Sequence, residues 1–432
     1  MTEGAQVTPF TTFTLILVVI VLLLVAEIEH RAVVAILAAV LSAYFGISYG
    51  LFKPADIIEM MNVDTVLFIT GVLILFESIS RSGLFDVVGM SLARLIGPRP
   101  RALVYALIAL TTLFSGISSN VTVMLVMGNI TLRLAALAGV EAEELVILEC
   151  LQTNVGGLLL PLSSVPALIV STKTGLGFAD FLRVTGPLIL MLTALALFYS
   201  TRVMTSGEAG GAAWKRDSLR AHVVNSTALY RSTAIFAAFL TAASMSDLIG
   251  LNLTLITFIF VTATFLLSSL DPDEVFRSVD WGIPFFVGGF FVFVGGLERS
   301  GVLDAVSSAI APLLGMPEVL AAPLLLLMCA LISAFIDNIP VVLLLYPIVK
   351  GVAETTGLRA LPLYWAMIIG SNLGGNLTTF ASPSVLIGVR FLERRGMRVT
   401  MGEFLKKGAP LAIMQILLSM IYVASLTALN LL

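Results

Sequence analysis

The hexapeptide RSGLFD at residues 81–86 returns as RSGVLD at residues 299–304. We call the separation in sequence between Arg81 and Arg299 the repeat shift. Two further pairs of motifs have the same separation: FSGISSN at 114–120 with ISAFIDN at 332–338, and NVGG at 154–157 with NLGG at 372–375. A single shift that holds from residue 81 to residue 157 is hard to obtain by chance. We therefore infer that the chain contains one structural unit twice.

The composition is that of a membrane protein. Of the 432 residues, 58% are apolar and 12% are charged, and the mean hydropathy is +1.05. Soluble domains carry about 25% charged residues, so half of the usual water-facing charge is missing. The formal net charge of −3 offers no face for a polyanion. These values exclude a soluble enzyme, a nucleic-acid binder and a disordered chain, and they predict an all-α polytopic membrane protein.

Residues for catalysis or metal binding are scarce. Cys150 and Cys329 both lie in apolar stretches, which implies no disulfide framework. His30 and His222 are the only histidines, too few for a His-rich metal site. The sequence also lacks a P-loop, a zinc-protease motif and a nucleophile elbow. We predict that the chain is not an enzyme and has no cofactor beyond a coupling ion.

A helix that spans a bilayer needs about 20 mostly apolar residues. The uninterrupted runs that predict full spans are 10–26, 33–52, 65–80, 186–201, 232–249, 253–268, 281–297 and 409–430. Four further apolar stretches are interrupted. Residues 102–137 and 319–352 carry polar residues near their centres, and their arms are too short for two comfortable spans, so we predict re-entrant hairpins. Residues 145–171 and 363–389 contain Gly-Gly and Pro, which predicts broken helices.

Each unit then has five spans, and an odd number of spans inverts the second unit relative to the first. The predicted parts are a first unit at 1–203, a polar cytoplasmic linker at 204–230 and a second unit at 231–432. With the N-terminus outside, all but six of the 24 basic residues lie on the cytoplasmic side, as the positive-inside rule expects. We predict a protein of the cell (inner) membrane with both termini outside.

Polar residues at membrane depth are costly, and they mark the candidate site. In the first unit the candidates are Ser118, Ser119, Asn120, Thr122, Asn154, Gly156, Gly157, Ser163 and Ser164. In the second unit they are Asp337, Asn338, Asn372, Gly374, Gly375, Asn376, Thr378, Thr379 and Ser382. A helix opened at Gly-Gly frees carbonyl groups for Na⁺, and half-helix N-termini attract anions. We predict Na⁺ sites at Asn120 with Gly156, and at Asp337 with Asn338 and Gly374.

Some carboxyl groups near this site allow two interpretations. Asp337 is the only ionisable residue at a predicted hairpin tip, where it either caps a helix or binds Na⁺ or H⁺. Glu149 precedes Asn154 by five residues and is either a structural partner or an ion relay. Asp64 and Asp280 precede predicted spans, and we expect both to cap helices.

With these residues assembled, the chain resembles the ion transporter superfamily. It is most similar to the branch of arsenite permeases, NhaD-type sodium–proton antiporters and the P protein; citrate carriers and divalent-anion sodium symporters are more distant. The resemblance rests on LISAFIDNIP at 331–340, GSNLGGNLTT at 370–379, FLKKGAP at 404–410, SNVT at 119–122 and NVGG at 154–157. It implies a scaffold, a mobile transport domain with elevator-type alternating access, and a homodimer.

Two stretches depart from the pattern of that superfamily. Its members commonly have Asp-Asn at both hairpin tips, whereas the first tip here reads Ser119-Asn120. After the first Gly-Gly they usually have a Thr-rich run that ends in GDPPN, whereas residues 158–166 read LLLPLSSVP. The departures imply fewer coupling ions, or a substrate that is smaller or less charged than a dicarboxylate.

The sequence therefore predicts a secondary transporter of a small ion or anion, coupled to Na⁺ or H⁺. Its expected partners are that substrate and the lipid bilayer, with no nucleic acid. A Na⁺/H⁺ antiporter and an ion channel whose hairpins act as selectivity loops are the alternatives.

Overall fold

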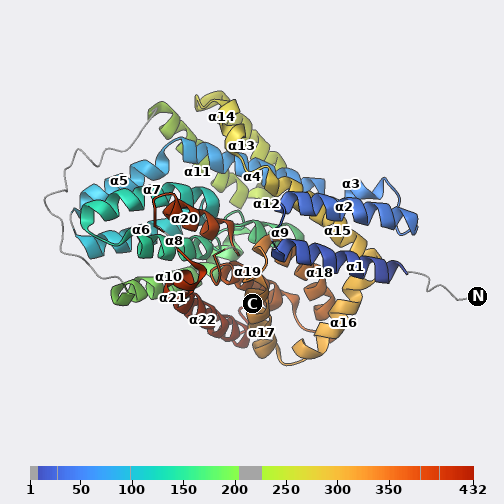
Figure 1. Cartoon of the computed structure of the whole chain (residues 1–432). Coiled ribbons are helices and arrows are strands. Elements are labelled where there is room, and N and C mark those ends of the chain that lie inside the picture. The colour runs from blue at the N-terminus through green and yellow to red at the C-terminus, as the bar shows by residue number, and fades with distance from the viewer. Residues whose placement is uncertain (1–7, 27, 98, 204–225, 380, 398) are drawn as a thin grey trace, which may run out of the picture.

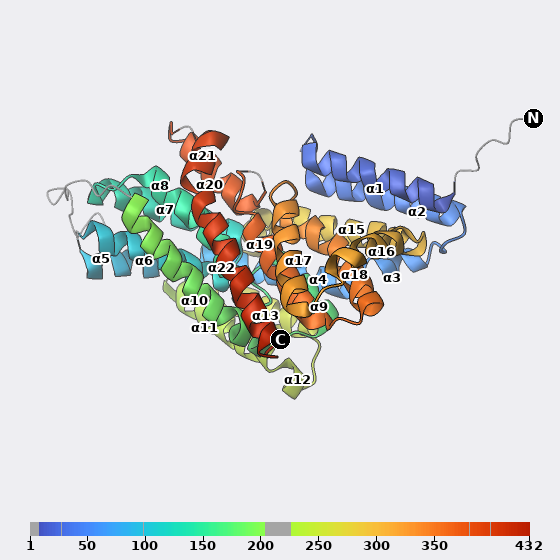
Figure 2. The same cartoon turned by 90° about the horizontal axis from the view of Figure 1, so that it is seen from below.

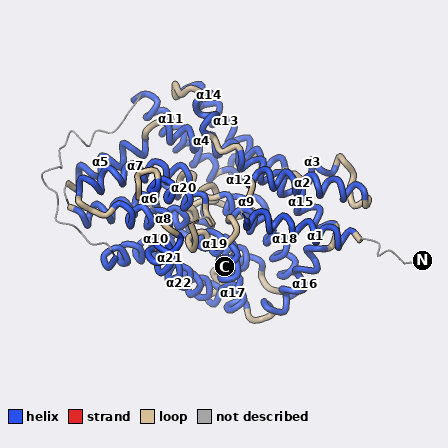
Figure 3. Tube along the Cα trace, viewed as in Figure 1, coloured by secondary structure: helices blue, strands red, loops and turns tan. Residues whose placement is uncertain are grey.

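The computed structural model describes residues 8–26, 28–97, 99–203, 226–379, 381–397 and 399–432. Regular structure in these ranges is helical throughout and contains no strand, as Figure 3 shows. Eight of the described helices are long and apolar enough to cross a membrane. These findings confirm the predicted all-α membrane architecture.

The two halves of the chain contain helices in the same order. The first half has α1 (Pro9–Ala26), α2 (Arg31–Ser48), α3 (Asp56–Met60), α4 (Val63–Arg81), α5 (Leu84–Ile96), α6 (Pro100–Gly116), α7 (Asn120–Ala138), α8 (Ala142–Gly156), α9 (Val165–Thr174) and α10 (Phe178–Val203). The second half has α11 (Ser226–Ser244), α12 (Ser246–Ile249), α13 (Leu253–Leu267), α14 (Pro272–Ser278), α15 (Gly282–Arg299), α16 (Val302–Leu314), α17 (Glu318–Ser333), α18 (Asn338–Thr356), α19 (Ala360–Gly374), α20 (Pro383–Glu393), α21 (Met401–Lys407) and α22 (Ala409–Ala428). The first residues of α5 to α9 are related to those of α16 to α20 by the repeat shift. The sequence repeat is thus also a repeat of helix boundaries.

One group of helices, which we call the outer bundle, consists of α1, α2, α4, α11, α13 and α15. Its strongest contacts pair α2 with α15 and α4 with α13, so each pair joins the two halves of the chain (Figures 1 and 2). The α2–α15 contact brings backbones together, because a Cβ atom on Gly289 would lie 2.9 Å from the carbonyl oxygen of Ala35. Such close approach is what glycine permits in membrane helix packing.

The second group, which we call the hairpin core, consists of α6–α10, α17–α20 and α22. In each half the first arm of the hairpin packs on the first part of the broken helix, as α6 on α8 and α17 on α19. The second part of each broken helix packs on the hairpin of the other half: α20 packs on α7, and α9 packs on α18. This mutual packing agrees with two related halves; their opposite insertion into the membrane stays a prediction.

Two short amphipathic helices that the sequence analysis missed, α5 and α16, connect the outer bundle to the hairpin core. Each follows the repeated RSG motif, whose glycines Gly83 and Gly301 have φ angles of 82° and 80°. Residues with a Cβ atom avoid this left-handed region, so the motif is repeated where the same turn is needed. The turn lets α5 and α16 leave the direction of α4 and α15.

Several predicted boundaries differ from the structure. Residues 232–249, expected as one span, fall in α11 and α12, which are separated at Met245. Helix α11 begins inside the predicted linker 204–230, whose residues 204–225 lie outside the described residues. The hairpin arms α7 and α18 have 19 residues each, longer than the 18-residue α1, so these two are not the short arms expected. The other arms, α6 and α17, are shorter, with 17 and 16 residues. Whether the hairpins stop within the bilayer stays a prediction.

Neither of the two predicted aspartates is the N-cap residue of its helix. Helix α4 is capped by Asn62, whose side chain accepts a hydrogen bond from the backbone of Thr65, so the expected cap by Asp64 is wrong. Asp280 precedes Trp281, the N-cap residue of α15, and accepts a hydrogen bond from the backbone N–H of Gly282 at 3.0 Å. The cap is the asparagine because α4 begins at Val63, before the first residue of the predicted span.

Candidate functional site

Both broken helices stop at a Gly-Gly pair and resume beside a proline. Helices α8 and α19 end at the first glycine of each pair, and Pro166 and Pro383 lie in the first turns of α9 and α20. Proline fits the first turn because it lacks the N–H group that a longer helix would require. The segments 157–164 and 375–382 are therefore the predicted breaks, and Figure 3 shows loop segments meeting near the centre of the molecule.

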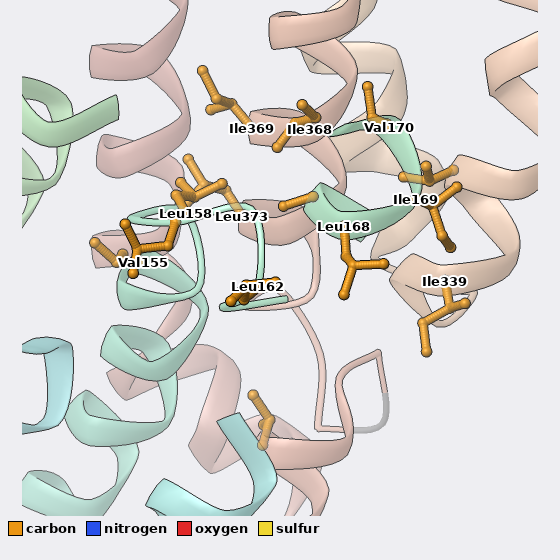
Figure 4. Packing of buried hydrophobic residues seen from close by; sticks show 14 of the residues in the cluster. Val155, Leu158, Leu162, Leu168, Ile169, Val170, Ile339, Ile368, Ile369 and Leu373 are labelled. Carbon is orange, nitrogen blue, oxygen red and sulfur yellow. The ribbon is translucent and has the colours of Figure 1, made fainter. Parts of the chain in front are cut away.

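Apolar packing holds the first break in place. Leu158 and Leu162, which belong to the run that replaces the expected polar residues, are buried beside α9 and α19 (Figure 4). Leu168 on α9 and Leu373 on α19 are buried in the same cluster. The leucines thus give this break an apolar support.

The first glycine of each pair allows close helix packing. A Cβ atom on Gly156 would lie 2.2 Å from the carbonyl oxygen of Thr112 on α6. A Cβ atom on Gly374 would lie 2.3 Å from the carbonyl oxygen of Ala330 on α17. Both distances are far below van der Waals contact, so any larger residue would push the broken helix away from the hairpin.

A chain of amide hydrogen bonds connects the first hairpin tip to both breaks. Asn120 Nδ2 donates to Asn154 Oδ1 at 3.2 Å, and Asn154 Nδ2 donates to Asn376 Oδ1 at 2.8 Å. Asn376 Nδ2 then donates to the carbonyl oxygen of Leu151 at 3.1 Å. Ser382 also donates to Asn154 Oδ1, at 3.1 Å. Asn154 is therefore the centre of a neutral network that joins the start of α7, the end of α8 and the second break.

The second hairpin tip is held by charge. Asp337 caps α18, because its Oδ1 atom accepts a hydrogen bond from the backbone of Ile339 at 3.0 Å. Its Oδ2 atom lies 2.5 Å from Nη1 of Arg31, and Nη2 of Arg31 lies 3.1 Å from Oδ2 of Asp280. The side chains of Arg31 and Asp337 are each 19% exposed, so this ion pair is partly shielded from water. Arg31 thereby connects the outer bundle to the hairpin core.

A central cavity lies where the tips and breaks meet. The cavity and its opening together enclose about 620 Å³ of empty space. The polar residues of its lining from the tips and breaks are Ser119, Asn120, Ser163, Ser164, Asn338 and Ser382. Among its described lining residues Arg31 is the only one with a charged side chain. The predicted convergence of both hairpins and both breaks is therefore present.

Two further cavities adjoin this centre. One is lined by Glu29, His30, Asp337 and Arg390, and Arg31 lines both it and the central cavity. The other is lined by Thr122 together with Glu77 and Asp280. The ion pair of Arg31 and Asp337 thus lies between the central cavity and a more open space.

Other candidate residues lie away from the cavity or bond locally. Thr378 donates to the carbonyl oxygen of Ala334 at 2.7 Å, and the Thr379 hydroxyl lies 3.7 Å from the sulfur of Met401. Asn372 donates to the carbonyl oxygen of Ile368 on its own helix, at 2.9 Å. Its Oδ1 atom and the hydroxyl of Ser118 are buried without a hydrogen-bond partner among the described residues.

The second glycines of the pairs lie against the amide chain. A Cβ atom on Gly157 would lie 3.0 Å from the side chain of Asn120, and one on Gly375 would lie 3.4 Å from Nδ2 of Asn154. Gly156 and Gly374 instead face neighbouring helices. The predicted Na⁺ sites therefore stay predictions, with Gly156 and Gly374 packed against α6 and α17 and Asp337 bound to Arg31.

Sequence reasoning missed Arg31. Its position just before an apolar run suggested only a cytoplasmic charge that orients the protein in the membrane. Helix α2 begins at Arg31 itself, ahead of the predicted span, and the side chain reaches Asp337 from there. Nothing in the local sequence identifies a partner 306 residues away.

Comparisons with known proteins agree with this geometry. The citrate transporter family model matches residues 20–370. An uncharacterised transporter of Mycobacterium tuberculosis is 25% identical over 364 residues, covering 83% of this chain and 85% of its own. The human P protein is 24% identical over 505 residues, covering 97% of this chain and 60% of its own length.

Two solved structures share the fold. The YdaH transporter of Alcanivorax borkumensis matches with a TM-score of 0.65 and 14% identity, covering 93% of this chain and 99% of that one. MtrF of Neisseria gonorrhoeae, whose structure is described as illuminating a class of antimetabolite efflux pumps, matches with a TM-score of 0.61 and 12% identity. That match covers 98% of this chain and 95% of MtrF.

The fold and the central cavity define an integral membrane transporter. Because the family model covers most of the chain, the protein belongs to the citrate transporter family. Its family and structural neighbours are transporters and not enzymes, which confirms that part of the sequence analysis. The resemblance to the ion transporter superfamily is confirmed as well.

Proposed function

We propose that this protein is a secondary active transporter of a small anion, coupled to Na⁺ or H⁺. The observation that carries the proposal is the central cavity, whose wall combines both hairpin tips and both helix breaks with Arg31. Arginine binds carboxylates and other oxyanions through its planar pair of N–H groups. Ser382 and the asparagines offer neutral hydrogen-bond donors around the same space.

The second hairpin tip is the proposed coupling site. A Na⁺ ion or a proton that binds Asp337 would weaken its attraction to Arg31, because each reduces the negative charge on the carboxylate. The guanidinium group could then turn to an anion in the central cavity. Coupling follows in this scheme because substrate and coupling ion each favour separation of the same ion pair.

The proposed transport cycle is alternating access of the elevator type. The hairpin core would move relative to the outer bundle, with α5 and α16 as its connections. We further propose a homodimer in the cell (inner) membrane with both termini outside. The proposal of citrate as a first substrate to test comes from the printed name of the family.

The decisive experiment measures uptake of radiolabelled citrate, and of arsenite in parallel, into proteoliposomes. We expect saturable uptake driven by an imposed Na⁺ or pH gradient, and loss of that drive in Asp337→Asn. Asp304→Asn is the matched control, since this exposed aspartate on α16 is remote from the cavity. Gradient-driven uptake unchanged in Asp337→Asn would give Asp337 a purely structural role.

The same vesicles separate the other functions. Single-channel currents with non-saturating flux would identify an ion channel. Exchange of Na⁺ for H⁺ that needs no organic or inorganic anion would identify a Na⁺/H⁺ antiporter. Either result would replace the proposed anion transport.

A further inference from the structure

A group of polar side chains lies buried inside the first half of the hairpin core, away from the cavities described above. Glu149 on α8 is fully buried, and the hydroxyl of Thr131 on α7 donates to its Oε1 atom at 2.6 Å. The hydroxyl of Thr111 on α6 faces the same carboxyl group. One turn further along α8, Gln152 accepts a hydrogen bond from Thr112 at 3.0 Å. Three helices thus enclose one carboxyl group.

In the second half, the equivalent position is filled by residues without a polar cluster. The repeat shift relates Thr111, Thr112, Thr131, Glu149 and Gln152 to Cys329, Ala330, Val349, Met367 and Gly370, in that order. All five of the second set are buried between α17, α18 and α19. The fold therefore does not need a polar cluster at this position. A buried carboxyl group lowers stability unless it is compensated, so its presence in one half points to a function.

Within the part of the chain that the structure describes, no charged group compensates Glu149. Its Oε2 atom is buried without a hydrogen-bond partner among the described residues. No charged side chain of the packed helices α6, α7, α10, α19, α20 and α21 is among the groups that act on it. Lys407 binds Glu143 and Glu144 in the first turn of α8. The adjacent titratable thiol, Cys150, is directed to Met124 on α7.

We propose that Glu149 is a proton-binding site that connects proton transfer to movement of the first hairpin; this inference rests on the proposed function. In this proposal the carboxyl group is protonated, with Oε1 accepting from Thr131 and the proton on Oε2, the oxygen that has no hydrogen-bond partner among the described residues. Glu149 does not line any of the three cavities described above. Deprotonation breaks the O–H bond, leaves the electron pair on Oε2 and transfers the proton to water.

Water reaches Glu149 only if α6 and α7 separate from α8. The contacts that would have to change are the hydrogen bonds near the tip of the same hairpin. Ser115 on α6 donates to the carbonyl oxygen of Thr153 at 2.7 Å, and Asn120 donates to Asn154. Both acceptors lie on α8, just after Glu149. Release of the proton therefore coincides with opening of the first hairpin tip at the central cavity.

Infrared difference spectroscopy of the purified full chain tests the protonation directly and needs no substrate. The spectrum of the wild type minus that of Glu149→Gln should contain the C=O stretching band of a protonated carboxylic acid at neutral pH. Wild type minus Glu403→Gln, which removes an exposed carboxylate, should lack this band. Absence of the band for Glu149, or its loss when NaCl replaces KCl, would overturn the proposal, because the group would then be ionised or bind a metal cation.

Citrate transport provides the second measurement. An imposed pH gradient should accelerate uptake by wild type and lose this effect in Glu149→Gln, whereas citrate exchange at equal pH persists. The double variant Glu149→Met/Thr131→Val copies the second half and should behave like Glu149→Gln while keeping a packed core. A retained response to the pH gradient in both variants would overturn the coupling role. If wild type does not move citrate, the function proposal fails for that substrate and the infrared result still decides the protonation of Glu149.

Discussion

At the first hairpin tip Asn120 belongs to a series of hydrogen-bonded amide side chains, whereas at the second tip Asp337 forms an ion pair with Arg31. The helices on both sides of these tips begin at positions related by the repeat shift, so their backbones follow one plan. The first tip is joined to both breaks within the hairpin core. The second is joined through Arg31 to the outer bundle. The first tip is therefore held by neutral contacts within the hairpin core, and the second by a charged contact with the outer bundle.

Glycine packing is the feature that the two halves share most closely, and its removal should have the largest effect. Gly156→Ala and Gly374→Ala each place a Cβ atom against a backbone carbonyl that cannot rotate away. Overpacking typically costs about 1–3 kcal/mol and occasionally more, and contact with a backbone carbonyl places these variants at the upper end. We expect both variants to lose the sharp size-exclusion peak in detergent. Gly186→Ala on α10 is the control, because its Cβ would meet no atom within 4 Å.

If only one of the two variants were stable, the two halves would not depend equally on glycine packing. That result would show that one broken helix tolerates displacement from its hairpin and the other does not. The half that tolerates the methyl group would then be the looser one.

The ion pair at the second tip should give the next largest effect. Arg31→Gln leaves two partly buried carboxylates without their cation, and Asp337→Asn leaves Arg31 with Asp280 alone. We expect each variant to lose about 2 kcal/mol of unfolding free energy, less than a fully buried pair because water reaches both side chains. The double variant should lose less than the sum of the single losses. Thermal unfolding in detergent at low ionic strength measures the difference, and strictly additive losses would contradict a direct contact.

Ser119 occupies the position in the first tip that corresponds to Asp337, and its substitution is the control for the single and double variants. Ser119→Ala removes a hydroxyl group that makes no capping hydrogen bond. We expect a change within about 0.5 kcal/mol, as for substitutions outside packed or bonded positions.

Asn154 and Asn372 occupy equivalent positions in the two broken helices and have different partners. Asn154 takes part in three side-chain hydrogen bonds that join separate segments. Asn372 bonds only its own helix in the described structure. We expect Asn154→Ala to lower the unfolding free energy by about 2–3 kcal/mol and Asn372→Ala by about 1 kcal/mol or less. Equal losses, measured by thermal unfolding, would mean that the amide chain does not hold the tip to the breaks.

The breaks in the two broken helices could be predicted because their signals are local. Gly-Gly ends α8 and α19, and proline lies in the first turns of α9 and α20. The turns that the RSG motif makes before α5 and α16 were recognised only in the structure. Residues such as Asn120 and Ser382 could be assigned to one cavity because the repeat brings equivalent segments together. Each of these signals lies close in sequence to the boundary that it determines.

The partners of individual side chains could not be predicted in this way. Arg31 and Asp337 are distant in sequence, and their contact depends on how α2 packs against α15 and how the second hairpin sits beside them. Gly156 and Gly374 were assigned to ion binding because an opened helix exposes carbonyl groups. Their close contacts with α6 and α17 depend on the distance between helix axes, which no residue pattern specifies.

The smallest expected effect concerns the segments that lead into α10 and α22. Gly177 and Thr400 occupy matching positions ahead of the similar sequences FLRVTGP at 181–187 and FLKKGAP at 404–410. The backbone N–H of each donates to an acidic side chain in the following turn, Asp180 or Glu403. Only the second copy forms a full capping box, because Thr400 also has a hydroxyl group that accepts from the backbone of Glu403. Thr400→Ala should therefore destabilise the start of α21 slightly, and Gly177→Ala should have no matching effect on a cap.

Acid should weaken this capping box. The hydrogen bond from the backbone of Thr400, followed by that from its hydroxyl, holds the pKa of Glu403 below its ordinary value. A carboxyl group with a lowered pKa in the folded state stabilises the protein above its unfolded pKa, about 4.3, and this contribution is lost as the pH falls through the folded value. The unfolding temperature of wild type should therefore fall slightly more than that of Glu403→Gln between about pH 5 and pH 3. Parallel curves for the two proteins would show that the box does not contribute to stability, and the two copies of this segment would then be equivalent.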